Sequence, residues 1–279
     1  MKKISRRSFL AAAGLSVAAL ALTACGGSSA STASSVASSA ASSEAASTSA
    51  AAGELATVEA GKLTMATNAT FPPYEMTTDA GDIEGIDVET AQAIADKLGL
   101  ELQIDDMDFD AALLSVQQGK ADIAMAGVTV TDERKAVMDF SDNYATGIQS
   151  IIVPEGSDIA SPDDLAGKKI GTQRGTTGYI YCSDDFGDDA VVAYDDGLTA
   201  VQALNNGQVD AVVIDNAPAM EYVAANPGLV ILDTNYAEED YAIGLAKGSA
   251  LEDAVNAALE ELKADGTLQS IVDKYITAE

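Results

Sequence analysis

The stretch Met125–Ser141, which reads Met-Ala-Gly-Val-Thr-Val-Thr-Asp-Glu-Arg-Lys-Ala-Val-Met-Asp-Phe-Ser, joins the end of an apolar strand to a short polar helix. Thr131 is a good helix N-cap, and the acidic residues that follow it favour the first turn of a helix. The turn before this helix would bring Gly127, Thr129 and Arg134 close together. A guanidinium that a helix holds at a fixed angle is suited to binding one carboxylate through two hydrogen bonds.

Arg134 also has a simpler interpretation, as a solvated surface charge paired with Glu133 or Asp139. A binding site needs further polar groups that converge on the guanidinium, whereas a surface charge needs none. The positions of the other polar residues along the chain therefore decide which interpretation to prefer.

The composition indicates a folded and strongly acidic protein. The 279 residues carry a formal charge of −29, and 47% of them are hydrophobic and fall in periodic runs, which predicts a packed core. Because such a surface repels phosphate groups, we expect no binding to nucleic acid or to anionic lipid headgroups. The chain contains no His, which excludes a His-based catalytic triad and a His-ligated metal.

The first 25 residues have the features of an export signal. Basic residues at positions 2–7 precede a short apolar stretch, and Leu22-Thr23-Ala24-Cys25 resembles the lipobox of bacterial lipoproteins. We expect a signal peptide over residues 1–24, with lipidated Cys25 anchoring an extracytoplasmic protein to the cell membrane. Residues 5–10 resemble a twin-arginine signal, with an ordinary basic segment as the alternative. Cleavage would remove four basic residues and no acidic one, giving a charge of −33.

Residues 25–53 are expected to form the lipidated Cys and a flexible tether, because Ser, Ala, Thr and Gly dominate and no apolar period is present. No later stretch has the roughly 18 apolar residues of a membrane-spanning helix, so the protein is expected to be anchored to the membrane without crossing it. Lipidation of Cys25 would leave Cys182 without an intrachain partner, so no disulfide is expected.

Beyond residue 53, patterns typical of strands and helices alternate along the chain. Strands are expected, for example, over residues 62–67, 121–126 and 242–245, and helices with one apolar stripe lie between strands. This alternation favours an α/β fold with largely parallel sheets. The remaining length of about 225 residues is large for one core and favours two lobes.

Ligands of such folds bind at the carboxyl ends of the strands. Polar and aromatic residues occupy the ends of the expected strands: Asn68, Phe71, Phe109, Gly127, Thr129, Thr176, Thr177 and Asp215. One fixed cation, Arg134, suits a carboxylate, and one fixed anion, Asp215, suits an ammonium. Two aromatic rings, Phe71 and Phe109, suit an aliphatic or flat side chain. Because buried charges are costly unless they are paired, the set predicts a site for the zwitterion of an α-amino acid.

Each of these residues has an alternative role. The two phenylalanines can be core residues, Asp215 can cap the next helix, and Gly175–Gly178 can be a simple turn. That loop lacks the Lys of a phosphate-binding loop, so nucleotide binding is not expected. The acidic runs 105–110 and 184–189 lack the spacing of a calcium loop and are expected to be solvated surface. We therefore expect neither a metal nor a cofactor.

Seven motifs span nearly all of the chain after the tether. They are Thr-Phe-Pro-Pro-Tyr-Glu at 70–75, Gly-Ile-Asp-Val-Glu at 85–89, Met-Asp-Phe at 107–109, Ala-Gly-Val-Thr-Val-Thr-Asp-Glu-Arg at 126–134, Asp-Phe-Ser at 139–141, Gly-Thr-Thr-Gly at 175–178 and Ala-Asp-Gly-Thr at 264–267. In this order they resemble the polar amino-acid-binding proteins of ATP-driven (ABC) importers, the solute-binding family that includes the glutamine-, histidine- and lysine/arginine/ornithine-binding proteins. The set is highly specific, although each motif alone is weak.

The resemblance implies a two-lobed fold like that of type II periplasmic binding proteins, with two hinge crossings. Residues 54–146 together with 239–279 would form the first lobe, and residues 147–238 would form the second. It further implies that the lobes close on a polar L-amino acid and that the closed, monomeric protein docks on an ABC permease in the membrane. No chemistry is needed for that function, so an enzyme is not expected.

The resemblance also implies roles for matching residues. Arg134 and the backbone N–H groups of Thr129 and Thr177 would hold the ligand carboxylate. Asp215, the Thr129 hydroxyl and the Gly127 carbonyl would hold the ammonium.

Phe71 and Phe109 would flank the ligand side chain. Three other positions, Asn68, Gln173 and Arg174, depart from the family pattern. Many relatives carry Asp where this chain has Asn68, which argues against a cationic ligand. Gln173 and Arg174 differ from the glutamine-binding pattern, and Arg174 would favour an acidic ligand if it pointed inward. The sequence therefore favours a polar neutral amino acid.

Two other functions remain as alternatives. Some relatives of this scaffold are periplasmic dehydratases of the aromatic amino-acid pathway, which need a carboxylic acid placed as general acid. A sensory module would bind the ligand only to report it to a receptor. An Asp215 that is positioned for an ammonium favours binding over catalysis.

Overall fold

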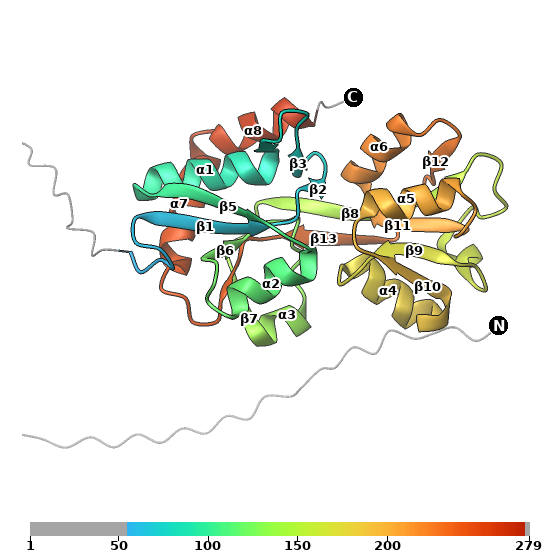
Figure 1. Cartoon of the computed structure of the whole chain (residues 1–279), viewed down its shortest axis with the longest axis horizontal. Helices are drawn as coiled ribbons and strands as arrows, with labels where there is room; N and C mark the ends of the chain where they lie inside the picture. The colour runs from blue at the N-terminus through green and yellow to red at the C-terminus, as the bar shows by residue number, and fades with distance from the viewer. Residues whose placement is uncertain (1–54, 277–279) are drawn as a thin grey trace, which may run out of the picture. The chain divides into compact units, whose positions relative to one another are not determined.

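The computed structural model describes residues 55–276. The predicted signal peptide, Cys25 and the predicted tether therefore lie outside the described residues. Two β-sheets with helices packed on them form a first lobe and a second lobe, which two strands join (Figure 1). Within residues 55–276, no helix is both long and apolar enough to cross a membrane.

The first lobe is built on a five-stranded sheet. Its strands are β1 (Lys62–Thr67), β5 (Glu101–Asp106), β6 (Ile123–Ala124), β7 (Met138–Phe140) and β14 (Gly244–Ala246), and a small separate sheet holds β2 (Thr70–Phe71), β3 (Glu75–Thr77) and β4 (Ile83–Glu84). The order in the larger sheet is β5-β1-β6-β14-β7, with β1 parallel to β5 and β6. β14 is antiparallel to β6 and β7, so the C-terminal part of the chain returns to this lobe.

Helices cover both faces of the first sheet. They are α1 (Ile86–Leu98), α2 (Phe109–Gln117), α3 (Asp132–Val137), α7 (Glu252–Ala264) and α8 (Thr267–Tyr275). In Figure 1, α1, α7 and α8 gather on one side of the sheet and α2 lies on the other. α1 ends at Gly99, whose φ of 70° forms the left-handed C-cap expected of a glycine there. Thr131 caps α3 by accepting a hydrogen bond from the N–H of Arg134, as the sequence predicts.

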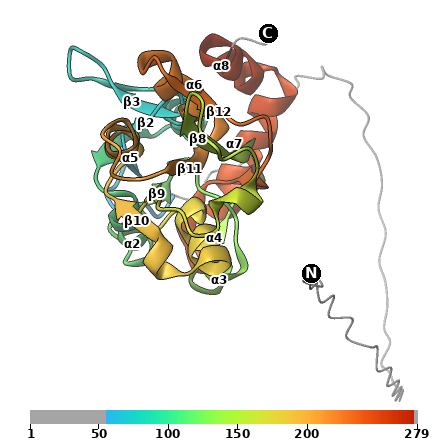
Figure 2. The ribbon, with the colours of Figure 1, turned by 90° about the vertical axis from the view of Figure 1, so that its right-hand side faces the viewer.

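The second lobe is built on a six-stranded sheet. Its strands are β8 (Ala145–Pro154), β9 (Ile170–Gln173), β10 (Val191–Tyr194), β11 (Ala211–Asp215), β12 (Leu229–Ile231) and β13 (Ala237–Tyr241), and its helices are α4 (Thr177–Phe186), α5 (Gly197–Asn205) and α6 (Asn216–Ala225) with two 3-10 turns at Pro162–Leu165 and Asp188–Ala190. The order is β10-β9-β11-β8-β12, and β13 pairs with β8. Figures 1 and 2 show α4 on one side of this sheet and α5 and α6 on the other.

β8 and β13 are the hinge strands that connect the lobes. They pair antiparallel from Ala145 opposite Tyr241 to Gln149 opposite Ala237, and β8 then continues into the second sheet. Figure 1 shows the two strands side by side between the lobes. The boundaries predicted at 146/147 and 238/239 fall within these strands and stay a prediction.

Two strand predictions are wrong in extent. The strand expected over 121–126 is reduced to β6, because the chain turns at Gly127, whose φ is 54°. The strand expected over 242–245 is replaced by β13 and β14, because Ala242 donates to Val128 and Ser141 donates to Ile243 instead of forming one continuous ladder.

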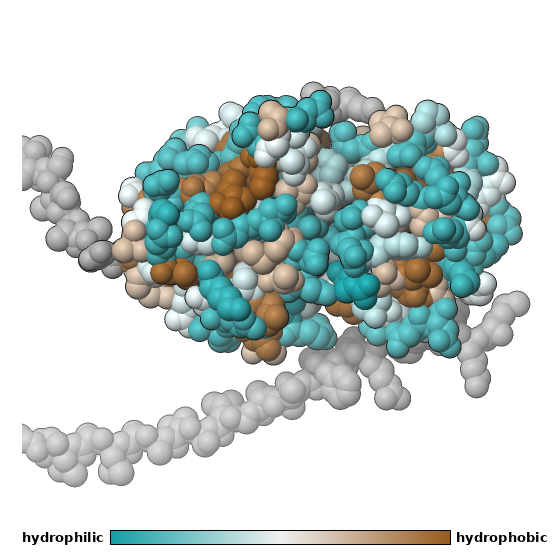
Figure 3. Space-filling model, in the orientation of Figure 1, coloured by the Kyte–Doolittle hydropathy of each residue, from teal (hydrophilic) through white to brown (hydrophobic). Residues whose placement is uncertain are grey.

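The surface is largely hydrophilic on the face drawn in Figure 3, where hydrophobic residues form separate patches. Exposed large hydrophobic side chains of this kind are ordinary on a folded protein. The acidic runs 105–110 and 184–189 consist mainly of exposed and partly exposed residues, as the sequence predicts.

Candidate functional site

A cavity lies between the two lobes, at the carboxyl ends of β1, β6, β9 and β11. The space between atoms there measures about 310 Å³, including its opening to solvent. Both lobes contribute to its lining, which consists of Asn68, Phe71, Glu75, Phe109, Ala126, Gly127, Thr129, Arg134, Gln173, Thr176, Thr177 and Asp215. All nine ligand-binding residues predicted from the sequence are therefore brought together in one place.

Arg134 is buried, with only 8% of its surface exposed, and it is directed toward this cavity. Its Nη1 donates to the Thr129 carbonyl at 2.7 Å and its Nη2 to the Gly175 carbonyl at 3.1 Å. No carboxylate of residues 55–276 lies within ion-pairing distance of it, and Asp139 instead pairs with Lys247. The interpretation of Arg134 as a solvated, paired surface charge is therefore wrong. Backbone carbonyls orient the guanidinium and leave its charge available for a ligand.

Two backbone N–H groups lie next to Arg134. Thr129 faces Tyr241 across an antiparallel bridge, and the bonds on either side, from Val130 and Ala242, leave the Thr129 N–H without a backbone acceptor. Thr177 is the first residue of α4, where N–H groups have no intrahelical acceptor. Together with the guanidinium, these groups suit an anion such as a carboxylate.

The Gly175–Gly178 segment is a helix start and not a simple turn. Thr176 caps α4 by accepting a hydrogen bond from the Tyr179 N–H, and its own hydroxyl donates to the Gln173 carbonyl at 2.8 Å. Thr176 thus fixes the first turn of α4 beside the cavity.

Gly127 occupies a position that only glycine fits. A Cβ atom built there would lie 2.8 Å from a ring carbon of Phe71 and 3.3 Å from the Tyr241 ring, and the positive φ also disfavours a side chain. The Gly127 N–H donates to Asp87 Oδ2 at 2.9 Å. The backbone can therefore approach a ligand closely at this point.

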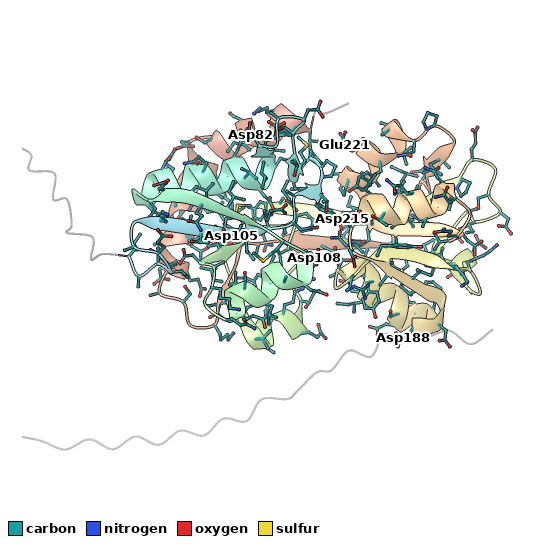
Figure 4. The ribbon with its side chains drawn as sticks, in the orientation of Figure 1. Asp82, Asp105, Asp108, Asp188, Asp215 and Glu221 are labelled. Atoms are coloured by element: carbon teal, nitrogen blue, oxygen red, sulfur yellow. The ribbon has the colours of Figure 1, made fainter. Side chains whose placement is uncertain are left out.

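Asp215 stands at the N-terminus of α6, but its side chain does not cap that helix. Its Oδ2 accepts from Gln149 Nε2 at 2.7 Å, and its Oδ1 accepts from the Tyr241 hydroxyl. The capping alternative is therefore wrong. Burial and the charge of the neighbouring Glu239 raise the pKa of Asp215 to about 7. Figure 4 shows Asp215 where the two lobes meet.

Phe71 and Phe109 serve both of the roles considered for them. Each lines the cavity and each is also nearly fully buried in the core of the first lobe. The Arg134 guanidinium carbon lies 5.3 Å from the centre of the Phe109 ring, a cation–π contact that helps to hold the guanidinium.

Hydrogen bonds join the lobes around the cavity. Gln173 Nε2 donates to Asn68 Oδ1 at 2.8 Å, and the Tyr222 hydroxyl donates to the Thr70 carbonyl at 2.5 Å. Asn68 Nδ2 donates to the Met107 carbonyl at 3.0 Å, so both polar atoms of this amide have protein partners. The lobes are thus closed, and Asn68 contributes to the closure.

A second pair of carboxyl groups, Glu75 and Asp87, is fully buried in the first lobe. Burial, followed by the charge of Asp87, raises the pKa of Glu75 well above its usual value. Burial raises the pKa of Asp87 to about 6, against the lowering effect of the Gly127 N–H. Among residues 55–276, no group of three or more His, Cys, Asp or Glu side chains is placed to hold a metal.

Three polar residues that contact the lining of the cavity were not predicted from the sequence. Gln149, Glu239 and Tyr241 of the hinge strands contact Asp215 or Thr129. Gln149 and the adjacent Ser150 are the two polar residues in the otherwise apolar run 148–153, which was an available signal, whereas Glu239 stands among three consecutive acidic residues that look alike. Arg174 is exposed, 3.6 Å from Asp195, and does not line the cavity, so the argument for an acidic ligand has no support.

Comparisons with known proteins agree with this geometry. Residues 63–278 match the family of bacterial extracellular solute-binding proteins, family 3. A probable histidine-binding protein of Neisseria gonorrhoeae is 33% identical over 96% of this chain and 95% of its own length. The L-cystine-binding protein TcyJ of Escherichia coli K12 is 34% identical, covering 79% of this chain and 85% of its own length.

Solved structures show the same fold. An ancestral arginine-binding protein bound to glutamine has a TM-score of 0.75 and 42% identity, and the match covers 79% of this chain and all of that one. The two-lobed α/β prediction is thereby confirmed as the fold of amino-acid-binding proteins. The chain belongs to the bacterial extracellular solute-binding proteins, family 3.

Proposed function

We propose that this protein captures a polar L-amino acid between its lobes outside the cytoplasm and delivers it to an ABC permease. One observation carries the proposal: a buried guanidinium with no carboxylate partner among residues 55–276 lies in the same cavity as a buried carboxylate. Arg134 with the N–H groups of Thr129 and Thr177 suits an α-carboxylate, and Asp215 suits an α-ammonium. Lipidated Cys25 would keep the protein at the membrane.

The α-carboxylate and α-ammonium are common to the ligands named for the relatives, which are histidine, cystine, arginine and glutamine. The side-chain end of the cavity offers Phe71, Phe109 and amides, and the Asn68 amide is already bonded to Gln173. Closure is favoured by the ligand because only the closed conformation makes contacts from both lobes.

A thermal-shift screen of the mature chain, with Cys25→Ser to avoid lipidation, against the twenty common L-amino acids tests the proposal. Ligand that binds only the native state raises the melting temperature by mass action. We expect stabilisation by a small set of polar amino acids. Arg134→Ala should abolish it, because a buried charge-assisted contact is worth about 2–5 kcal/mol, or roughly 30- to several-thousand-fold in Kd.

Lys135→Ala is the matched control, since Lys135 is the next residue of α3 and is exposed. It should bind like the wild type. If no amino acid stabilises the wild type, or if Arg134→Ala and Lys135→Ala behave alike, the proposal is wrong. Turnover of prephenate or arogenate would instead support the dehydratase alternative, and unchanged uptake after gene deletion would support the sensory one.

A further inference from the structure

A second buried carboxylate, Glu239, lies beside Asp215. It is 5% exposed and comes from the hinge strand β13. Its Oε2 accepts from the Thr129 hydroxyl at 3.1 Å and from Gln149 Nε2 at 3.0 Å. Its Oε1 is buried and has no hydrogen-bond partner within the described part of the chain. Such an oxygen is costly to bury unless a donor reaches it at some stage of the protein's function.

One nitrogen holds the two carboxylates together. Gln149 Nε2 donates to Asp215 Oδ2 at 2.7 Å and to Glu239 Oε2 at 3.0 Å, so the two side chains are close neighbours. No Lys or Arg of residues 55–276 forms an ion pair with either carboxylate, and Arg134 donates to carbonyls instead. Two buried carboxylates this close cannot both ionise without a large cost, unless a cation comes between them.

The surroundings of Asp215 favour retention of a proton. The charged and titratable groups that face it from the packed elements are Glu239, Tyr241, Glu75, Tyr74, Tyr181 and Arg134. Burial and the charge of Glu239 favour a proton on Asp215, whereas the charge of Arg134 and the hydrogen bonds from Tyr241 and Gln149 oppose it. The Tyr241 hydroxyl can donate to or accept from Asp215, so their contact is compatible with both protonation states.

We propose that Glu239 is a second carboxylate of the ammonium subsite, and that an ammonium group entering beside Asp215 and Glu239 displaces a proton from Asp215. This inference rests on the proposed function. It adds Glu239 to the binding site and couples ligand binding to the release of a proton. The ammonium brings one positive charge to a pair of carboxylates that held one proton, and that proton passes to solvent.

The coupling has a direct consequence for affinity. A ligand that binds the deprotonated pair must displace the proton, so apparent affinity falls as pH drops through the pKa of Asp215, about 7. For that pKa, the Kd should be about tenfold weaker at pH 6 than at pH 8. About one proton should be released per ligand bound at pH 6, and almost none at pH 8.

Titration calorimetry with L-arginine in two buffers of different ionisation enthalpy, at pH 6 and pH 8, measures the protons released. The α-ammonium of free L-arginine titrates mainly above pH 8, so its own contribution to the proton balance is small and is subtracted using the titration of the free ligand. In Glu239→Gln, Asp215 loses its acidic neighbour, so we expect proton release at pH 6 to fall to less than half and the pH effect on Kd to fall below about threefold. A merely structural loss would weaken binding equally at both pH values.

Glu238→Gln is the matched control, because Glu238 is the preceding residue of β13 and is exposed. It should retain the wild-type proton release. Binding without proton release by the wild type, or equal release by Glu239→Gln, overturns the inference and leaves the proposed function intact. If L-arginine does not bind, carboxyl ¹³C NMR of the ligand-free protein tests the inference instead. A carboxyl that titrates near pH 7 in the wild type, and no longer does so in Glu239→Gln, supports the inference. The lack of such a carboxyl in the wild type overturns the inference.

Discussion

The two buried carboxyl pairs use the same chemistry for different purposes. Asp215 and Glu239 lie at the hinge, bridged by Gln149 and close to Arg134. Glu75 and Asp87 lie inside the first lobe, where Asp87 holds the backbone N–H of Gly127. The first pair is positioned to respond to a ligand, and the second holds one wall of the cavity in place.

Burial and a raised pKa therefore do not by themselves identify a binding group. Asp87 and Asp215 both have a pKa raised by burial, to about 6 and about 7. The distinguishing feature is the partner: a backbone N–H of the same lobe for Asp87, and side chains of two hinge strands for Asp215. We therefore expect the hinge pair to govern binding and the first-lobe pair to govern stability.

The largest expected effect is on affinity. Asp215→Asn should weaken binding of the amino acid about 30- to 150-fold at pH 8, because a buried ammonium loses a charged partner worth about 2–3 kcal/mol. Asp87→Asn keeps an oxygen that can accept from Gly127, so its Kd should change by less than about fivefold. Calorimetry on both variants makes the comparison, and equal losses would remove the distinction between the pairs.

The next expected effect is on the pH dependence of stability, which the first-lobe pair should govern. Glu75 and Asp87 have pKa values that are raised in the folded state. Above about pH 4 the folded protein therefore binds more protons than the unfolded chain. Stability is consequently lost as the pH rises toward the pKa values of the two groups in the folded protein. For Asp87 alone, a pKa raised by burial to about 6 corresponds to a loss of about 3 kcal/mol of stability as the pH rises through that value.

Glu75→Gln removes one acid of the pair. Relative to the wild type, its free energy of unfolding should rise as the pH is raised from 4.5 to 7.5, because the wild type alone must take a proton from Glu75, as measured by urea denaturation without ligand. Glu75 also lines the cavity, but Asp215 and Arg134 keep their contacts, so the affinity for the amino acid should fall less than in Asp215→Asn. A constant difference from the wild type across this pH range would contradict the assignment.

The smallest effect concerns the closure of the lobes. Asn68→Ala removes the hydrogen bond to Gln173 across the cavity, which is worth about 0.5–1.5 kcal/mol, so affinity should fall about 2- to 10-fold. The loss should appear in the dissociation rate measured by stopped flow, since the bond exists only between closed lobes. Proton release on binding should remain that of the wild type, because neither carboxyl pair is altered.

The sequence was sufficient to predict the α/β fold and the gathering of residues at strand ends. Parallel strands bring their carboxyl ends to one edge of a sheet, so positions such as Phe71 and Thr129 can be assigned from local patterns alone. The capping of α3 by Thr131, which fixes Arg134, is equally local.

The hinge residues could not be predicted in the same way. Glu239 is next to Gln149 only because of the register between β8 and β13, which are almost ninety residues apart in the chain. Within Glu238-Glu239-Asp240 nothing local distinguishes the inward side chain from its neighbours. The role of Asn68 likewise depends on Gln173 of the other lobe, so its position at a strand end did not reveal its partner.

The alternation of side chains along β13 also makes the hinge a convenient place for an optical reporter. Glu239 is buried against Gln149 and Thr129, whereas Glu238 and Asp240 are exposed. A dye attached through Glu238→Cys would lie on the bending strand without touching the ligand. Cys182 is fully buried and its thiol has a pKa raised to about 12, so it would not compete for the label once Cys25 is replaced. The same strand that completes the site could thus report, as a change in fluorescence, the amino acid content of a solution.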